Sequence, residues 1–162
     1  MQFRALFLIM TVYFCSGFTD DSVLKEAREY FRQGAHSKSS AQSLNTLTAN
    51  ENKAVIKAYH GASYTLLAKH YVNPYSKLES LKRGLKIINE AVLADALEVE
   101  IRFIRFSIEE HIPSLVSFVS HLSDDKAIIL NHLKKTHSNY EVIKNYMLVS
   151  SNLTAEEKKK LN

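Results

Sequence analysis

The sequence is poor in the residues that end or interrupt secondary structure. Its 162 residues include four glycines, two prolines, one cysteine and no tryptophan. An all-β domain needs turn residues about every eight to twelve positions, so this scarcity argues against a β fold. Phosphate-binding loops and dinucleotide fingerprints, which need closely spaced glycines, are also absent. The composition favours α-helices, because long segments rich in leucine, alanine, lysine and glutamate run without a break.

A strong excess of one charge is missing as well. Lysine and arginine total 21 and aspartate and glutamate total 17, which gives a formal net charge of +4. The one dense basic run, residues 158–160, follows two glutamates and suits the end of a solvated helix. Proteins that bind nucleic acid concentrate basic residues on one face, so no nucleic-acid partner is predicted.

The N-terminal residues have the pattern of a secretory signal peptide. Arg4 precedes an apolar stretch at residues 5–14, and small residues follow at 15–17. The apolar stretch is too short for a permanent membrane anchor. We therefore expect residues 1–17 to be removed and the protein to be exported, to a periplasmic or an extracellular location.

Cys15 is the only cysteine and leaves one alternative open. A lipoprotein signal also ends in a cysteine, which is lipidated and anchors the protein to a membrane. Such a signal needs a small residue before the cysteine, whereas Phe14 is bulky. A membrane partner is thus expected only if Cys15 is lipidated. Removal of the signal would leave no cysteine for disulfides or for a thiolate site.

Residues 18–162 are predicted to form a single all-α domain of antiparallel helical hairpins, in a superhelix or an irregular bundle of about six to eight helices. Apolar residues at helical spacing predict a first helix that begins at Asp21 or Ser22 and ends at Gly34. The serine-rich residues 35–47 are predicted to form a loop.

The best-defined hairpin is expected at residues 49–94. Residues 48–51 (Thr-Ala-Asn-Glu) and 76–79 (Ser-Lys-Leu-Glu) have the spacing of capping boxes, which would start its two helices. Asn-Pro at 73–74 would separate them. Gly61 is small enough to let a neighbouring helix come close. The second helix has a one-sided apolar stripe with spacings of three and four, formed by Leu78, Leu81, Leu85, Ile88 and Val92.

Residues 98–112 fit a helix better than a strand. Their apolar residues alternate, as in a strand, but Glu98, Arg102, Arg105 and Glu109 are spaced by four, three and four. This spacing forms one helical stripe of opposite charges, whereas a strand would divide the four side chains between two faces. Shorter helices are expected further along the chain, after Pro113 and from Ser123, Ser138 and Thr154.

Residues 58–96 resemble a degenerate tetratricopeptide repeat. The matching positions are Gly61, Tyr64, Gly84, Ile88, Ala91 and Ala96. Lys57 stands where the repeat has tryptophan, and the hairpin is about eleven residues too long for a period of roughly 34. The chain also resembles exported helical proteins of Bacteroidetes-type bacteria, through residues 61–70 and 100–105. That second resemblance implies a helical fold in the cell envelope and no particular activity.

The residues that could carry chemistry are few. No two of the seven histidines have the i, i+4 spacing of a helical zinc site, so no metal and no cofactor is predicted. Glu109, Glu110 and His111 are adjacent in a helix and would point in different directions. Arg102 and Arg105 could together clamp a carboxylate or phosphate. The sequence favours the alternative that neighbouring glutamates, Glu98 and Glu109, neutralise them.

Tyrosines cluster around the first helix of the hairpin and the turn after it, and Tyr59 and Tyr71 are candidate anchors for a partner. With Arg102 and Arg105 they make up the candidate binding site, and no catalytic residue is predicted. We therefore expect a non-catalytic module of the bacterial cell envelope that binds a protein or peptide. Two alternatives remain open: a hydrolase whose histidine and carboxylate meet through folding, and a lipoprotein that acts as a spacer or stability factor.

Overall fold

A computed structural model describes residues 19–50, 52–113 and 120–162, which form eight helices and no strand. The predicted all-α fold is confirmed. In chain order the helices are α1 (Thr19–Gly34), α2 (Lys38–Thr48), α3 (Ala54–His70), α4 (Pro74–Ala94), α5 (Val99–Glu109), α6 (Leu122–His132), α7 (Tyr140–Val149) and α8 (Ala155–Lys159).

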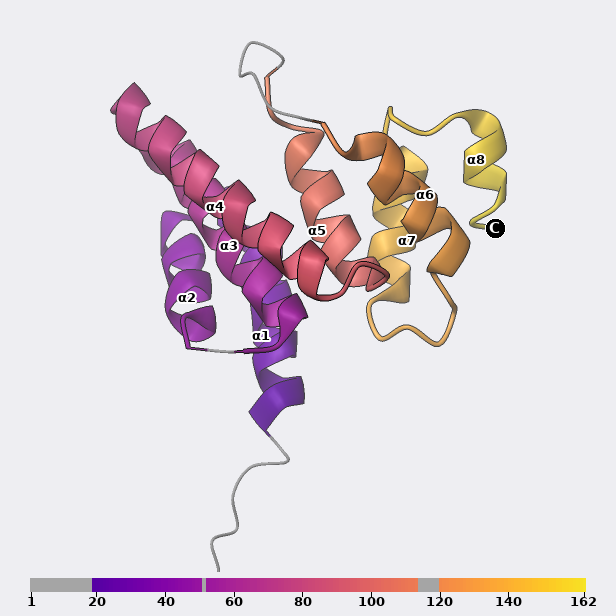
Figure 1. Cartoon of the computed structure of the whole chain (residues 1–162), viewed down its shortest axis with the longest axis horizontal. Helices are drawn as coiled ribbons and strands as arrows, with labels where there is room; N and C mark the ends of the chain where they lie inside the picture. The colour runs from indigo at the N-terminus through magenta and orange to yellow at the C-terminus, as the bar shows by residue number, and fades with distance from the viewer. Residues whose placement is uncertain (1–18, 51, 114–119) are drawn as a thin grey trace, which may run out of the picture.

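Helix α5 is the centre of the molecule (Figure 1). Helices α1 to α4 lie on one side of it and α6 to α8 on the other. Nine of its 11 residues are buried, because its apolar side chains divide between two cores. Ile101, Ile104 and Ile108 pack with α1 to α4, whereas Phe103 and Phe106 pack with α6, α7 and the C-terminal residues. The alternating apolar pattern of this segment therefore reflects a helix buried on two sides.

Helices α3 and α4 form the predicted hairpin and approach each other closely at two glycines. A Cβ atom on Gly61 would lie 2.7 Å from the carbonyl oxygen of Gly84, and one on Gly84 would lie 2.5 Å from that of Gly61. Both distances are below those of real Cβ contacts. The expectation that Gly61 lets a neighbouring helix come close is confirmed, and the neighbour's own glycine is equally necessary.

The predicted loop at residues 35–47 is wrong, because most of this segment is helix α2. Ser37 caps the helix by accepting a hydrogen bond from the backbone N–H of Ser40. The spacing of the buried residues Ala41, Leu44 and Thr48 is helical, and Ala41 and Leu44 belong to the core that α1 to α4 share with α5. Serine favours loops only weakly, so this buried stripe outweighs the preference.

Two predicted capping boxes do not form. Thr48 ends α2, where its hydroxyl donates to the carbonyl of Leu44, and α3 begins at Ala54 without a side-chain cap. Helix α4 begins at Pro74, and the Asn73 side chain accepts hydrogen bonds from the backbone N–H groups that follow. Proline at the first helical position preceded by asparagine is a stronger start signal than the serine two residues later.

The remaining boundaries follow the sequence more closely. Helix α5 confirms the helix expected at residues 98–112, and the capping box at Thr154 is present with Glu157 as its second member. Helices α6 and α7 begin within two residues of the predicted serines. The helix expected after Pro113 falls on residues 114–119, which lie outside the described part of the chain. None of the described helices is long and apolar enough to cross a bilayer.

Candidate functional site

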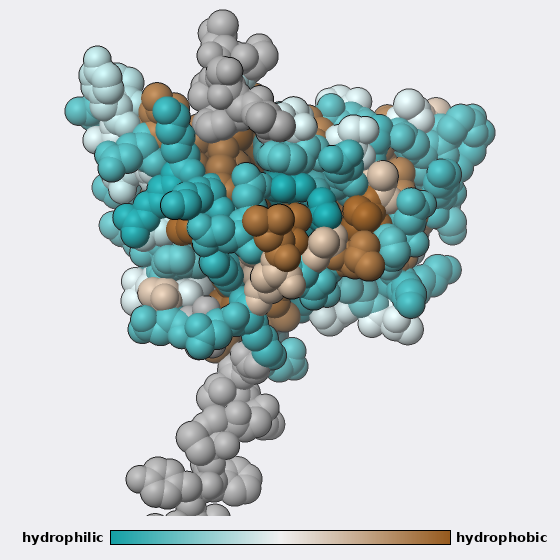
Figure 2. Space-filling view, viewed as in Figure 1, coloured by the Kyte–Doolittle hydropathy of each residue, from teal (hydrophilic) through white to brown (hydrophobic). Residues whose placement is uncertain are grey.

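A groove with a volume of about 1280 Å³ lies between α1 and α7. Helices α3 and α5 supply its buried floor, and the start of α4 contributes to one end. By contrast, the face in Figure 2 is mainly hydrophilic, with hydrophobic side chains in small separate patches. The groove is therefore the candidate site that we describe.

The floor of the groove is apolar and rigidly packed. Leu66 of α3 and Ile108 of α5 line it and are buried. Phe31 of α1 packs edge-on against Tyr59, with ring centroids 5.5 Å apart. Such pairs add to the stability gained from burial alone. The walls are more open, and Val142 of α7 is 52% exposed although it is apolar.

The rim of the groove is basic. Among the described residues its lining includes five lysine and arginine side chains, Lys25, Arg28, Arg32, Lys69 and Lys77, and a single acid, Glu29. The other 16 basic and 16 acidic residues of the chain balance one another, so the formal excess of +4 equals that of the groove. The fold therefore gathers at one site part of a charge that looks evenly spread in the sequence.

Three of these cations have no charged partner in the part of the chain that the structure describes. Arg28 pairs with Glu100 and Arg32 with Glu29. The side chains of Lys25, Lys69 and Lys77 make no ion pair or hydrogen bond with any described residue. They are exposed, and they line a groove whose floor is mainly apolar. This combination suits a ligand that is apolar along its length and carries negative charge near its ends.

All four helices along the groove point the same way. Toward one end of the groove, Arg28 in the middle of α1, Tyr59 in the first half of α3 and Asn139 at the start of α7 all bond to Glu100 in the first turn of α5. Near their ends, His70 of α3 bonds to the carbonyl of α1 residue Gly34, and Tyr146 of α7 to that of α5 residue Ser107. The carboxyl-terminal ends of the four helices therefore lie toward the same end of the groove, and those of α1 and α3 lie beside Lys69.

The opposite end of the groove is built around a buried carboxylate. Glu100 is 2% exposed and accepts two hydrogen bonds from Arg28, with Nε to Oε1 at 2.7 Å and Nη2 to Oε2 at 2.6 Å. The Tyr59 hydroxyl donates to Oε1 at 2.6 Å and the Asn139 amide donates at 3.1 Å. One side chain thus connects α1, α3, α5 and the start of α7.

The pKa shifts in this network follow from its burial. Burial and the neighbouring Glu100 charge raise the pKa of Tyr59 well above its usual value, so its hydroxyl stays protonated and keeps donating. The hydrogen bond to Glu100 raises the pKa of Arg28 despite the opposing effect of burial. Because of these shifts the Arg28 guanidinium stays charged and the Tyr59 hydroxyl stays protonated, so both keep donating hydrogen bonds to Glu100.

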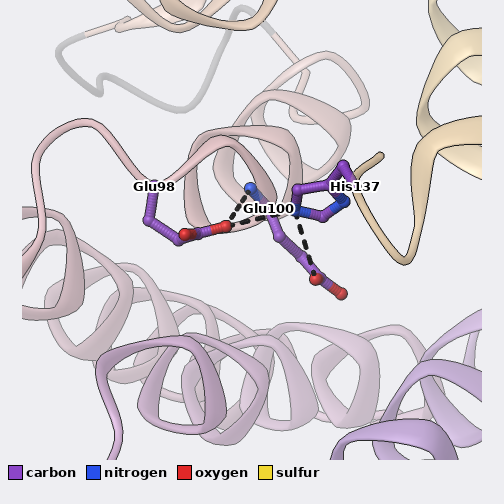
Figure 3. A group of neighbouring side chains, drawn as sticks. All are labelled: Glu98, Glu100 and His137. Atoms are coloured by element: carbon purple, nitrogen blue, oxygen red, sulfur yellow. Dashed lines mark hydrogen bonds and ion pairs between the residues drawn. The ribbon is translucent and has the colours of Figure 1, made fainter. Parts of the chain in front are cut away.

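Glu98, Glu100 and His137 lie close enough to suggest a metal site (Figure 3). His137 Nε2 is 3.3 Å from Glu98 Oε1 and 4.0 Å from Glu100 Oε2. However, His137 Nδ1 accepts the backbone N–H of Asn139 at 3.0 Å, so the ring hydrogen of the neutral side chain is on Nε2 and faces the carboxylates. Binding a metal through Nε2 would move that hydrogen to Nδ1, against the Asn139 N–H. The cluster is better suited to hydrogen bonding than to metal binding.

A second carboxylate fastens the other end of α7. Glu110 accepts hydrogen bonds from Tyr146 at 2.7 Å, from Asn152 at 2.9 Å and from the Ser150 hydroxyl. Burial alone would raise the pKa of Glu110, but these hydrogen bonds outweigh it and hold the pKa below its usual value. Glu100 and Glu110 therefore hold the two ends of α7 against α5, and between them α7 forms a wall of the groove.

Two histidines meet carboxylates elsewhere in the fold. His121 donates from Nδ1 to Glu109 at 2.8 Å, and its backbone N–H donates to the same side chain at 2.7 Å. The second pair is His137 with Glu98. None of these four side chains lines the groove, so neither pair lies where a ligand in the groove would be.

The predicted pair Arg102 and Arg105 is occupied by an acid that the sequence pattern did not indicate. Both bind Asp125 of α6, which is completely buried, at distances of 2.7 to 2.9 Å. The expectation that Glu98 and Glu109 neutralise them is wrong. Helix α5 is enclosed by neighbouring helices, so its charged side chains reach partners on those helices instead of each other.

The four predicted binding residues do not come together in one surface. Tyr59 is 1% exposed and contributes to the groove floor, whereas Tyr71 is half-buried and packs against the core that α1 to α4 share with α5. Arg105 is 4% exposed, and it and Arg102 lie outside the groove lining. Of the four residues, the structure places only Tyr59 at the candidate site.

The principal groove residues were missed because each has an ordinary place in a helical pattern. Lys25, Lys69 and Lys77 look like solvated lysines, and Val142 looks like a core residue of α7. The available signal was the contrast between an apolar helix face and the two lysines, Lys69 and Lys77, that have no acidic neighbour at i±3 or i±4. Comparison of the chain with protein-family models, with curated proteins and with solved structures found no match.

Proposed function

We propose that this protein is a non-catalytic binding module that holds an apolar segment of a protein partner in the groove between α1 and α7. One observation carries the proposal: an open groove with an apolar floor bears exposed cations that have no partner in the described chain. Exposed Val142 is the natural contact on its wall. The proposed binding surface is therefore the groove, which includes Tyr59 but not the other three binding residues expected from the sequence.

The size of the groove favours a protein segment over a small molecule. Pockets for drug-sized ligands have volumes of roughly 300–1,000 Å³, and this groove exceeds that range at about 1280 Å³. It is bounded by helices held at both ends through Glu100 and Glu110, so it is formed before a ligand arrives. A preformed groove binds with less loss of conformational entropy than a surface that must first be ordered.

The location that we propose is the cell envelope or the extracellular medium, after removal of residues 1–17. The support comes from the basic, apolar and small residues at the N-terminus. Expression of the full chain in a bacterium, followed by N-terminal sequencing of the exported product, tests this. A product that begins at residue 18 supports it. A product that begins at Cys15 with the added mass of lipid would establish the alternative, a membrane-anchored lipoprotein.

A display selection tests the binding function before any natural partner is identified. Random 14-residue peptides are selected on immobilised protein, with residues 1–162 and residues 18–162 used in parallel. Selected peptides should lose binding in Val142→Glu and retain it in Val149→Glu. Both valines are exposed residues of α7, but only Val142 lines the groove. Failure to enrich any peptide, or equal binding by both variants, would refute the proposal.

A further inference from the structure

We infer that the segment bound in the groove is an amphipathic α-helix of about three turns with acidic residues in its first turn, and that it lies antiparallel to α1, α3, α5 and α7. This inference rests on the proposed binding function and adds the conformation, charge and direction of the partner. Three independent properties of the groove support it: its dimensions, its charges and the direction of the helices around it.

The dimensions match a short helix. Along α3 the lining extends from Tyr59 to Lys69, a distance of about 15 Å at 1.5 Å per residue. A helix about 10 Å across and about 15 Å long occupies roughly 1200 Å³, close to the groove volume of about 1280 Å³. An extended strand of that length is about half as thick as a helix in one direction, so it would fill only about half of this volume. The apolar floor then requires an apolar stripe on the helix face that it buries.

The charges specify where the partner is acidic. Lys69, next to the last residue of α3, and Lys77, in the first turns of α4, are brought to one end of the groove by the short turn between these helices. The one acid among the described lining residues, Glu29, is already held by Arg32 and Gln33. Carboxylates at this end of the partner would therefore meet two unpaired ammonium groups and no unpaired acid of the described lining.

The directions of the surrounding helices specify how the partner lies. Helices α1 and α3 end beside Lys69, and α5 and α7 end toward the same end of the groove. The carboxyl-terminal end of a helix has a partial negative charge of about half a unit, smaller than the full positive charge of each lysine. A bound helix is favoured when its amino-terminal end, which has partial positive charge, lies there. First-turn carboxylates stabilise that same end of the bound helix. The acidic turn of the partner and its amino terminus are therefore expected at the same end of the groove.

Synthetic 14-residue peptides with one common apolar stripe test the inference by fluorescence anisotropy. The first peptide has three glutamates in its first turn, the second has three lysines there, and the third has the glutamates in its last turn. At about 0.1 M salt the first should bind about tenfold more tightly than the second, because up to two weak surface ion pairs, with Lys69 and Lys77, are replaced by repulsion. The difference should shrink at about 0.5 M salt. The third should bind more weakly than the first.

Charge reversal in the protein separates recognition from the helicity of the peptides. In the double variant Lys69→Glu/Lys77→Glu, the lysine peptide should bind more tightly than the glutamate peptide. The matched control is Lys82→Glu/Lys86→Glu, which changes two exposed lysines of α4 outside the groove and should leave the preference unchanged. Since the peptides are the same in each case, a reversed preference must come from the groove.

Several outcomes would overturn the inference. Equal binding of a variant of the first peptide with a central proline would show that no helix is needed. Displacement of the first peptide by myristate would assign the groove to acyl chains, and binding by residues 18–162 but not by 1–162 would assign it to the chain's own residues 5–14. Selection of basic or extended peptides that depend on Val142 would overturn this inference while the proposed binding function stands.

Discussion

Replacing Glu100 by glutamine should destabilise the protein more than any exposed charge substitution. The change removes the charge that balances Arg28 and prevents the carboxylate from accepting two hydrogen bonds from its guanidinium. It also weakens acceptance from Tyr59 and Asn139. Arg28 cannot simply move into water, because its side chain is only 18% exposed.

The magnitude follows from the burial of the pair. Removing one member of a buried ion pair costs about 3–5 kcal/mol, because the other charge is left without a partner. The partial exposure of Arg28 places Glu100→Gln at the lower end, about 3 kcal/mol. For a domain of this size that loss lowers the melting temperature by roughly 6–12 °C.

Urea unfolding followed by circular dichroism measures the loss. Glu90→Gln is the matched control, because Glu90 pairs with Lys57 at 2.7 Å while both side chains remain about 40% exposed, at 42% and 40%. An exposed pair of this kind contributes less than about 1 kcal/mol. If Glu100→Gln loses no more stability than Glu90→Gln, the argument that Glu100 connects four parts of the fold is refuted.

Three further predictions concern pH and packing. Above about pH 10 the unfolded chain releases protons that buried Tyr59 and half-buried Tyr146 retain, because burial raises the pKa of both, so stability should fall. Urea titrations between about pH 10 and 12 should show a shallower fall for Tyr59→Phe. The hydrogen bond from His137 lowers the pKa of Glu98. The stability that ionised Glu98 contributes is therefore present above about pH 4.5 and is lost as the pH falls further. In acid unfolding curves, the stabilities of wild type and Glu98→Gln should converge. Gly84→Ala should lose about 2 kcal/mol in urea unfolding despite alanine's better helix propensity, because its Cβ would lie 2.5 Å from the Gly61 carbonyl; a gain in stability would contradict the close approach.

The sequence allowed the fold class and most helices to be predicted, because one-sided apolar stripes and charge spacing are local patterns. Helix α4 and its stripe through Leu85 and Ile88 are of this kind. Helix α2 was missed because its signal, three buried residues among serines, is weak beside the loop preference of serine. The starts of α3 and α4 were misplaced because Thr48 hydrogen-bonds back into α2, and because Asn73 and Pro74 start α4 before Ser76 is reached.

The site could not be predicted in the same way, because it depends on contacts between distant residues. Glu100 meets Arg28 from 72 residues away and Tyr59 from 41, and Arg105 meets Asp125 from 20. Periodicity places each of these side chains on a helix but gives no information on which helices become neighbours. The predicted arginine pair was correctly recognised as needing an acid, and the acid lies on another helix.

The position of Glu100 also explains why a buried charge is useful in a fold that apolar contacts could hold together. An ion pair in the interior adds little stability over apolar residues of the same size, but it restricts which partners fit. Here Arg28 can satisfy Glu100 only when α1 lies at the starts of α3 and α5, and Asn139 only when α7 begins there too. Apolar contacts alone would favour movement of α1 toward α7 to cover Phe31 and Val142. The directional bonds at Glu100, the bond from Arg28 to the Ser138 hydroxyl and the bonds at Glu110 fix the positions of the two walls, and we infer that the groove keeps its width for this reason.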